Sequence, residues 1–281
     1  MRDARCEMRN NGRTDERTNK GARRIGATGR RDVRSATIAV AVLLGAMLGC
    51  SDVKASDPGL AARPARQVMI VIDVSGSRDA RELQEGKELL DRVLGTLSFR
   101  DRVVLIEMHE ANGGGRERWA DTMPAARRPS KPTAADREAL ENAIRAARAV
   151  APVFFDSTRV GHVRTTDVFG TLRTVAEYQR DAGDRQPVIV MLSDMLHSVP
   201  GMEMSRPGGV PALPWIERKQ QDGTLPRLDD ACVIVVGADY STTHLARVRQ
   251  FWMDFFAAAG AHLPERNYRR TITPGAPLEC A

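Results

Sequence analysis

The sequence predicts an α/β fold: a doubly wound, mostly parallel sheet of six strands with helices on both faces. Short unbroken apolar runs, such as 68–72, 188–192 and 232–236, are typical of strands buried on both sides. Amphipathic stretches alternate with these runs, which is the pattern of strands joined by crossover helices. With 281 residues, of which 42% are hydrophobic, the chain can bury a sizeable core, and its composition excludes collagen, coiled coil and disorder.

The first half of the domain contributes three strands and two helices to this prediction. Continuous apolar residues predict strands at 68–72 and 103–108, and a weaker strand is expected at 118–122, after the glycine-rich turn at 112–115. Helices are predicted at 78–97 and 134–150, because apolar residues recur there at helical spacing. The spacing is carried by Leu83, Leu90, Val93, Leu94 and Leu97 in the first helix, and by Leu140, Ile144 and Ala147 in the second.

The second half completes the sheet with strands at 188–192, 232–236 and 268–272 and helices at 167–180 and 245–259. The segment 197–228 breaks the alternation, since it contains five prolines and several glycines. It is expected to be a long ordered loop with one short helix around 215–221. Long loops inside compact domains are more often functional than idle, and an insertion without function is the alternative.

The N-terminal segment has the composition of an export signal. The first 50 residues hold 11 of the 42 Lys and Arg residues and 5 of the 36 acidic residues, so the remainder is neutral with 31 of each. Residues 35–49 carry no charge and are too few for a comfortable membrane span, which needs about 20 residues, whereas they suit the apolar region of a signal peptide. The basic balance therefore gives no reason to expect a nucleic-acid partner.

The residues Met47-Leu48-Gly49-Cys50 resemble a bacterial lipobox. The resemblance implies a signal peptide at 1–49 and a lipid on Cys50, followed by a flexible tether at 50–66 and a folded domain at 67–281. An uncleaved anchor helix is the alternative. Ser51 after the lipid site resembles lipoproteins sent to the outer membrane, and Asp52 leaves the inner membrane open. A monomeric domain facing the periplasm is expected.

Cysteine usage fits export. Cys6 lies in the leader and Cys50 is the expected lipid site, which leaves Cys232 and Cys280 as one possible disulfide in an oxidising compartment. Because sequence does not fix connectivity, two free thiols remain the alternative.

The sharpest motif is Asp73-Val74-Ser75-Gly76-Ser77, which stands where the first buried strand ends and a helix begins. In an open parallel sheet, ligands bind at such strand ends. The pattern resembles the metal-ion-dependent adhesion site (MIDAS) of von Willebrand factor type A (VWA) domains, and the resemblance extends over about residues 67–272. That family adds a threonine from a loop opening a later helix, matched by Thr166, and an aspartate directly after the next buried strand, matched by Asp194.

The resemblance implies a divalent cation held by oxygen ligands. Hydroxyls of Ser75, Ser77 and Thr166 would bind Mg²⁺ directly, while Asp73 and Asp194 would act mainly through coordinated water. One position would stay open for an Asp or Glu carboxylate of a protein partner. Mg²⁺ prefers such hard oxygens at about 2.0–2.1 Å, and Mn²⁺ or Ca²⁺ is the alternative ion. Two carboxylates at adjacent strand ends repel each other unless a cation lies between them.

Each of these residues also has an ordinary structural alternative. Ser77 and Thr166 could cap helices, and Asp194 could be a turn residue at a strand end. Thr165 could replace Thr166 as the ligand if the register is shifted by one. A second, softer metal site from His109, His162 and His197 is conceivable, but no ligand spacing supports it and three solvated histidines are expected instead.

The leading functional hypothesis is a non-enzymatic recognition module on a membrane-anchored lipoprotein. A metal-dependent hydrolase is the first alternative, because a bound ion beside serine hydroxyls could do chemistry. The sequence contains neither a G-x-S-x-G elbow nor an Asp-x-Asp nucleophile pattern to support it. A structural lipoprotein with a relic metal site is the second alternative. The sequence identifies neither the partner nor its pathway.

Overall fold

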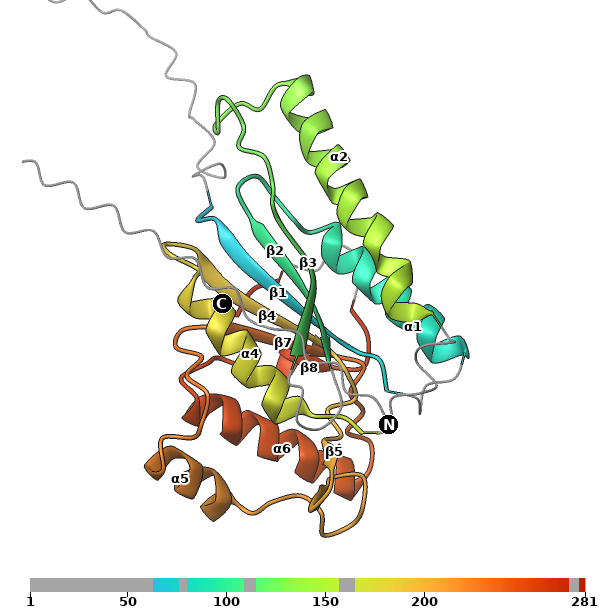
Figure 1. The fold of residues 1–281 in the computed structure, drawn as a ribbon, viewed down its shortest axis with the longest axis vertical. Coiled ribbons are helices and arrows are strands. Elements are labelled where there is room, and N and C mark those ends of the chain that lie inside the picture. Colours follow the sequence, from blue (N-terminus) through green and yellow to red (C-terminus); the bar gives the residue numbers. More distant parts are fainter. Residues whose placement is uncertain (1–62, 76–79, 109–114, 157–164, 273–277, 281) are drawn as a thin grey trace, which may run out of the picture. The chain divides into compact units, whose positions relative to one another are not determined.

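The computed structural model describes residues 63–75, 80–108, 115–156, 165–272 and 278–280, all within the second of two compact units, Ala55–Ala281. Its centre is a six-stranded sheet in the order β3-β2-β1-β4-β7-β8 (Figure 1). All neighbours pair in parallel except β2 and β3. The predicted fold class is therefore confirmed. The strands are β1 (Arg66–Asp73), β2 (Arg102–Met108), β3 (Gly115–Thr122), β4 (Gln186–Leu192), β7 (Cys232–Val236) and β8 (Tyr268–Arg269).

The central strand β1 is buried on both faces, and its side chains alternate between two cores. Met69 and Val71 belong to the core covered by α4 (Val168–Arg180) and α6 (Thr243–Ala258). Val68, Ile70 and Ile72 belong to the core covered by α1 (Ala80–Leu94) and α2 (Ala134–Val150). Figure 1 shows one helix pair on each side of the sheet. This two-sided cover explains why the strands are continuously apolar.

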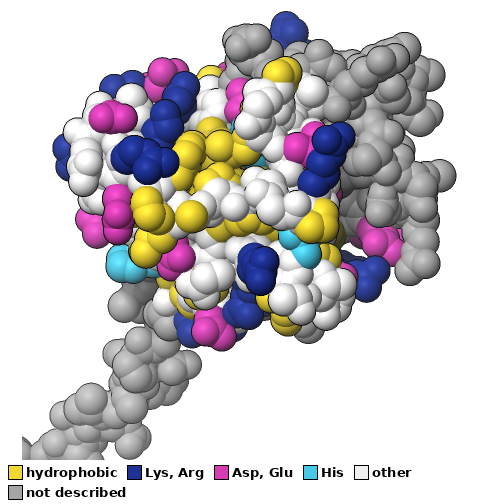
Figure 2. Space-filling model, turned by 90° about the horizontal axis from the view of Figure 1, so that it is seen from below, with side chains coloured by type: hydrophobic (Ala, Val, Ile, Leu, Met, Phe, Trp, Pro, Cys, Tyr) yellow, Lys and Arg dark blue, Asp and Glu magenta, His cyan; other side chains and the backbone are white. Residues whose placement is uncertain are grey.

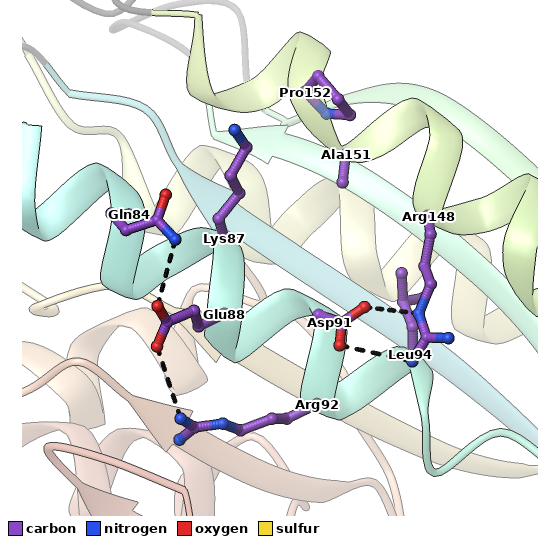
Figure 3. Close-up of a pocket in the computed structure, with 9 residues that line it drawn as sticks. All are labelled: Gln84, Lys87, Glu88, Asp91, Arg92, Leu94, Arg148, Ala151 and Pro152. Atoms are coloured by element: carbon purple, nitrogen blue, oxygen red, sulfur yellow. Dashed lines mark hydrogen bonds and ion pairs between the residues drawn. The ribbon is translucent and has the colours of Figure 1, made fainter.

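Local sequence explains where the helices begin and end. The helix α2 has the predicted bounds, because Thr133 and Asp136 form a capping box at its start. The helix α1 ends at Leu94, short of the expected residue 97, and the chain turns through Gly95 and Thr96. An ion pair joins Arg148 of α2 to Asp91 of α1 across the groove between the two helices (Figure 3).

The long segment between β4 and β7 is more ordered than its composition indicates. It contains a small hairpin of β5 (Ser198–Val199) and β6 (Met202–Glu203), which the sequence did not predict. It also contains the expected short helix, α5 (Leu213–Gln221). The described residues also form the 3₁₀ helices η2 (Ala151–Phe155) and η3 (Glu265–Asn267). The last strand is shorter than predicted, since β8 pairs only with Val235 and Val236 before β7 ends.

A buried ion pair fixes the start of β1. Arg66 and Asp101 are 2% and 0% exposed, and the guanidinium lies 2.7 Å from the carboxylate. The same carboxylate accepts hydrogen bonds from the amides of Arg66 and Ser98. A buried carboxylate is stable only when it is paired and hydrogen-bonded in this way. The pair therefore holds the first strand against the turn that leads into β2.

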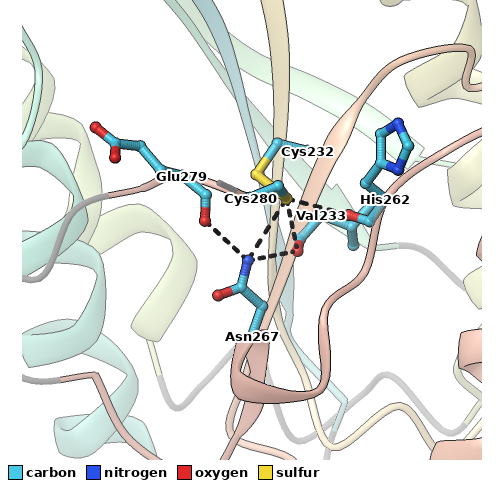
Figure 4. The surroundings of a disulfide bond; sticks show 6 residues. All are labelled: Cys232, Val233, His262, Asn267, Glu279 and Cys280. Carbon is cyan, nitrogen blue, oxygen red and sulfur yellow. Dashed lines mark hydrogen bonds between the residues drawn. A yellow bond between two sulfur atoms is a disulfide. The ribbon is translucent and has the colours of Figure 1, made fainter.

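A disulfide joins Cys232, the first residue of β7, to Cys280 near the C-terminus, with a Cα–Cα distance of 5.4 Å (Figure 4). Asn267 strengthens this attachment, because its side-chain amide donates to the carbonyls of Val233 and Glu279. Leu278 packs into the core at 1% exposure. The C-terminal tail is thus fastened to the start of β7.

Among the described residues, no helix combines the length and hydropathy required to cross a membrane. Cys50 and residues 1–49, for which an export signal is expected, lie outside the described residues.

Breaking the disulfide is expected to lower the free energy of unfolding. The cysteines are 48 residues apart, and a closed loop of that length stabilises by about 4 kcal/mol through the unfolded chain. Urea unfolding of the wild type should shift to lower urea when a reductant is added, whereas Cys280→Ser should already be shifted and should not respond. A wild-type midpoint that ignores the reductant would contradict this prediction.

Candidate metal centre

The candidate centre lies between β1 and β4, where the strand order of the sheet reverses. From β1 the chain continues to β2 on one side and later to β4 on the other. Asp73 ends β1, and Asp194 follows β4 by two residues. The register pairs Ile72 with Leu192, which sets Asp73 level with Ser193. Ligands of doubly wound sheets bind in the crevice at this reversal point.

The carboxylate of Asp73 is buried and is held by neutral donors. The residue is 2% exposed, and its two oxygens accept from the Ser75 amide and from the Ser193 hydroxyl, both at 2.9 Å. Within the described part of the chain, no Lys, Arg or His side chain forms an ion pair with it. Hydrogen bonds from neutral groups only partly offset the loss of solvation of a buried charge. A cation beside Asp73 would offset the remaining loss of solvation energy.

Ser193 is a site residue that sequence reasoning missed. It is fully buried, and its hydroxyl donates to Asp73 while accepting from the Met195 amide at 2.9 Å. It therefore ties the end of β1 to the turn that follows β4. Its position directly before Asp194 was a usable signal, because the residue after a buried strand lies level with the end of the neighbouring strand.

Asp194 sits in a tightly fixed turn. Its carboxylate accepts from the Leu196 amide at 2.8 Å, so the turn role considered from the sequence is real. The next residue, Met195, has φ 63°, a left-handed conformation that costs a non-glycine residue about 1–2 kcal/mol. Trp252 of α6 stabilises it by donating its indole N–H to the Met195 carbonyl at 2.8 Å. Burial and the charge of Asp194 raise the pKa of Tyr268.

Thr166 is attached to the same turn. Its amide and carbonyl exchange hydrogen bonds of 2.8 and 2.9 Å with Ser198, four residues beyond Asp194. The residue is 7% exposed, and its hydroxyl makes no hydrogen bond to another described residue. The cap of α4 is Asp167, which accepts from the Gly170 amide at 2.8 Å. Thr166 thus does not have the capping role that the sequence allowed, and the alternative ligand Thr165 is less buried.

The expectation of a solvated His197 is wrong, because the ring is buried against the start of α4. It is 2% exposed, and its Nδ1 accepts from the Val168 amide at 3.2 Å. Burial lowers the pKa of His197 to about 4, while the carboxylates of Asp167 and Glu203 act in the opposite direction. The ring is therefore neutral at pH 7 and holds the first turn of α4 against the turn after β4.

Four of the five predicted ligands, namely Asp73, Ser75, Thr166 and Asp194, are described, and all four belong to segments at this end of the sheet. The fifth, Ser77, lies outside the described residues, as do His109 and His162. No group of three or more His, Cys, Asp or Glu side chains in the described ranges could hold a metal ion.

Acid is expected to destabilise the domain through His197. Its folded-state pKa is below the unfolded value of 6.5, so the folded state binds fewer protons and stability falls as the pH falls. The loss should develop between pH 6.5 and about 4 and reach about 3 kcal/mol. His197→Asn keeps an acceptor near the Nδ1 position and should lack this loss. Parallel pH profiles of urea unfolding for the two proteins would contradict the assignment.

No family model and no curated protein matches this sequence. Solved structures of VWA domains resemble it in fold. The conserved hypothetical protein BatB from Bacteroides thetaiotaomicron is 11% identical, with a TM-score of 0.43 over 74% of this chain and 92% of that one. A von Willebrand factor type A protein from Catenulispora acidiphila is 15% identical, with a TM-score of 0.37 over 70% of this chain and 42% of its own.

A third similar structure is proximal thread matrix protein 1 from the mussel byssus, whose MIDAS motif holds zinc. It is 11% identical, with a TM-score of 0.38 over 66% of this chain. This chain spans 42% of the length of the mussel protein. These likenesses concern the fold alone.

Proposed function

We propose that this chain is a VWA-type recognition module whose centre holds a divalent cation, in the first place Mg²⁺, and uses it to capture a carboxylate of a protein partner. The observation that carries the proposal is the buried Asp73 carboxylate, which has only neutral donors among the described residues. A cation at the end of β1 stabilises that charge. Asp194, at the adjacent strand end, brings a second negative charge to the same edge.

The proposed ligands are all hard oxygens. Ser75, Ser77 and Thr166 would offer hydroxyls, and Asp73 and Asp194 would hold coordinated water. Oxygen-only donor sets suit Mg²⁺, Mn²⁺ and Ca²⁺ rather than softer metals. When bound, the ion supplies a strong positive charge with a position open to an incoming carboxylate.

Binding is favoured over hydrolysis by the state of His197. A general base has to be within about 2.6–3.2 Å of the proton it removes and needs a pKa near the working pH. The Nδ1 of His197 already accepts from the Val168 amide, and the pKa of about 4 keeps the ring a weak base. No observation in the described part of the chain favours the hydrolase or the relic-site alternative.

Removing the charge of Asp73 is expected to abolish cation binding. Asp73→Asn keeps the size of the side chain and an acceptor for Ser75 but loses the negative charge. Calorimetric titration with Mg²⁺ should give one site in the wild type and at least about tenfold weaker binding in the variant. A pull-down with the wild type should retain a partner that chelator releases, and the variant should retain none.

Asp239→Ala is the matched control, because Asp239 follows the neighbouring strand β7 and lies outside the proposed ligand set. It should bind Mg²⁺ as the wild type does. Equal Mg²⁺ binding by the wild type and Asp73→Asn would refute the metal centre. Capture that survives both chelator and Asp73→Asn would refute the role of the ion in recognition.

We also propose that the domain is anchored in the cell envelope by a lipid on Cys50, facing the periplasm from the outer membrane. The lipobox-like residues 47–50 and the uncharged stretch before them support this. Mass spectrometry of the mature protein is expected to show an acylated N-terminal Cys50, and Cys50→Ala should keep its leader. A mature chain that begins elsewhere, or that carries no lipid, would contradict the anchor.

A further inference from the structure

A groove of about 810 Å³ runs along α4, between this helix and the segment 223–229. Near the start of α4 it continues into a smaller hollow of about 90 Å³, since both share Arg173, Thr224, Leu225 and Pro226 as lining residues. The groove lies within the size range of ordinary ligand sites, about 300–1,000 Å³. Neither cavity is lined by a residue of the candidate metal centre.

The groove carries an excess of positive charge. Arg173 and Arg180, both exposed and seven residues apart on α4, make no ion pair with other described residues. Lys219 of α5 adds a cation at the small hollow, 5.5 Å from the centre of the Trp215 ring. Two acids line the groove: Asp229 is paired with Arg227 at 2.9 Å, and Glu177 lies on α4 between the two arginines without an ion pair to either. Groove and hollow together therefore keep an excess of positive charge for an anionic ligand.

The groove between α1 and α2 makes an instructive contrast (Figure 3). Its volume is about 440 Å³, and it also contains arginines. There, however, two of the three lining cations are paired within the groove, Arg92 with Glu88 and Arg148 with Asp91, and Lys87 is the third.

The small hollow is apolar and sized for an aliphatic side chain. Phe169, Trp215 and Phe255 line it, and the Phe169 ring lies 5.0 Å from Trp215 and 5.3 Å from Phe255. Figure 2 shows the end of the molecule that carries α5 and α6, with hydrophobic side chains gathered in its middle and Lys and Arg side chains around and below them. A cavity of about 150 Å³ holds benzene, so a hollow of about 90 Å³ suits a leucine or valine side chain better than an aromatic ring.

The spacing of the cations indicates a ligand with several carboxylates. Arg173 and Arg180 are seven residues apart on α4, which is about 10 Å along a helix axis. An acidic peptide can place one carboxylate against each arginine, whereas the anion of a fatty acid carries only one.

We propose that this groove binds an acidic peptide segment of a partner protein, with carboxylates against Arg173, Arg180 and Lys219 and one aliphatic side chain in the hollow. The proposal does not depend on the metal centre, because none of its contacts involves the bound ion.

The test measures fluorescence anisotropy of a labelled peptide, Glu-Asp-Glu-Leu-Asp-Glu, titrated with the full chain in nanodiscs of uncharged phospholipid, with EDTA present throughout. Saturable binding is expected. Replacing the leucine of the peptide by alanine should weaken binding about tenfold, since a buried leucine side chain contributes about 1.5–3 kcal/mol. Replacing it by tryptophan should also weaken binding, because the hollow is too small for the ring.

The matched variants are Arg173→Glu and Arg218→Glu. Both change the charge by the same amount at exposed helical positions, but only Arg173 lines the groove. Arg173→Glu should weaken binding about fivefold to tenfold, and Arg218→Glu by less than about twofold.

Three results would overturn the proposal. The first is equal binding of the leucine and alanine peptides, and the second is an equal effect of the two variants. The third is binding of dodecanoate without binding of the peptide, which would assign the groove to small amphiphilic anions. Because EDTA is present, a failed metal centre leaves the expected peptide binding intact, and a failed groove leaves Mg²⁺ binding intact.

Discussion

The hydrogen bond from the Ser193 hydroxyl to the Asp73 carboxylate is the contact on which the functional end of this molecule depends. It connects the ends of β1 and β4, the two strands between which the strand order of the sheet reverses. Ser193 also accepts from the Met195 amide, so the same hydroxyl fixes the turn that presents Asp194. One buried side chain thereby sets the relative positions of the Asp73 and Asp194 carboxylates, which strand pairing alone would not determine.

This arrangement buries the charge of Asp73 at a place where no Lys, Arg or His side chain of the described residues pairs with it. At the opposite end of the sheet, Asp101 shows the other solution, because it is buried against Arg66 and Arg63. The two aspartates have nearly the same exposure, 2% for Asp73 and 0% for Asp101, so burial does not distinguish them. They differ in the groups that contact the carboxylate, which are guanidinium groups for Asp101 and an amide and a hydroxyl for Asp73. A buried acid with an internal guanidinium is a structural element, whereas a buried acid held by N–H and O–H donors at a ligand-binding edge is suited to a cation from solution.

The sheet could be predicted from the sequence because its central strands are continuously apolar and the apolar residues of its helices recur at helical spacing. The sequence did not predict the hairpin of β5 and β6, since two-residue strands have no periodicity to detect. Asp73 and Asp194 could be placed at neighbouring strand ends from their position after apolar runs, and their binding of an ion stays a prediction. The place of Ser193 after an apolar run put it level with Asp73, but its hydrogen bond to that residue, 120 residues away, could not be predicted. The role of His197 could not be predicted either, because it depends on a contact with a segment 29 residues away.

The helix α4 links the two proposed recognition surfaces. Thr166 precedes it at the metal centre, and Phe169 in its first turn lines the small hollow while its ring lies 4.5 Å from that of His197. In both proposals the surface binds carboxylates, at the metal centre through an ion and in the groove through arginines. A partner that offers one acid to the ion and an acidic segment to the groove would bind the second site as an intramolecular step, which raises affinity without any further contact. The short span of α4 between the two surfaces makes a single acidic segment sufficient for such a partner.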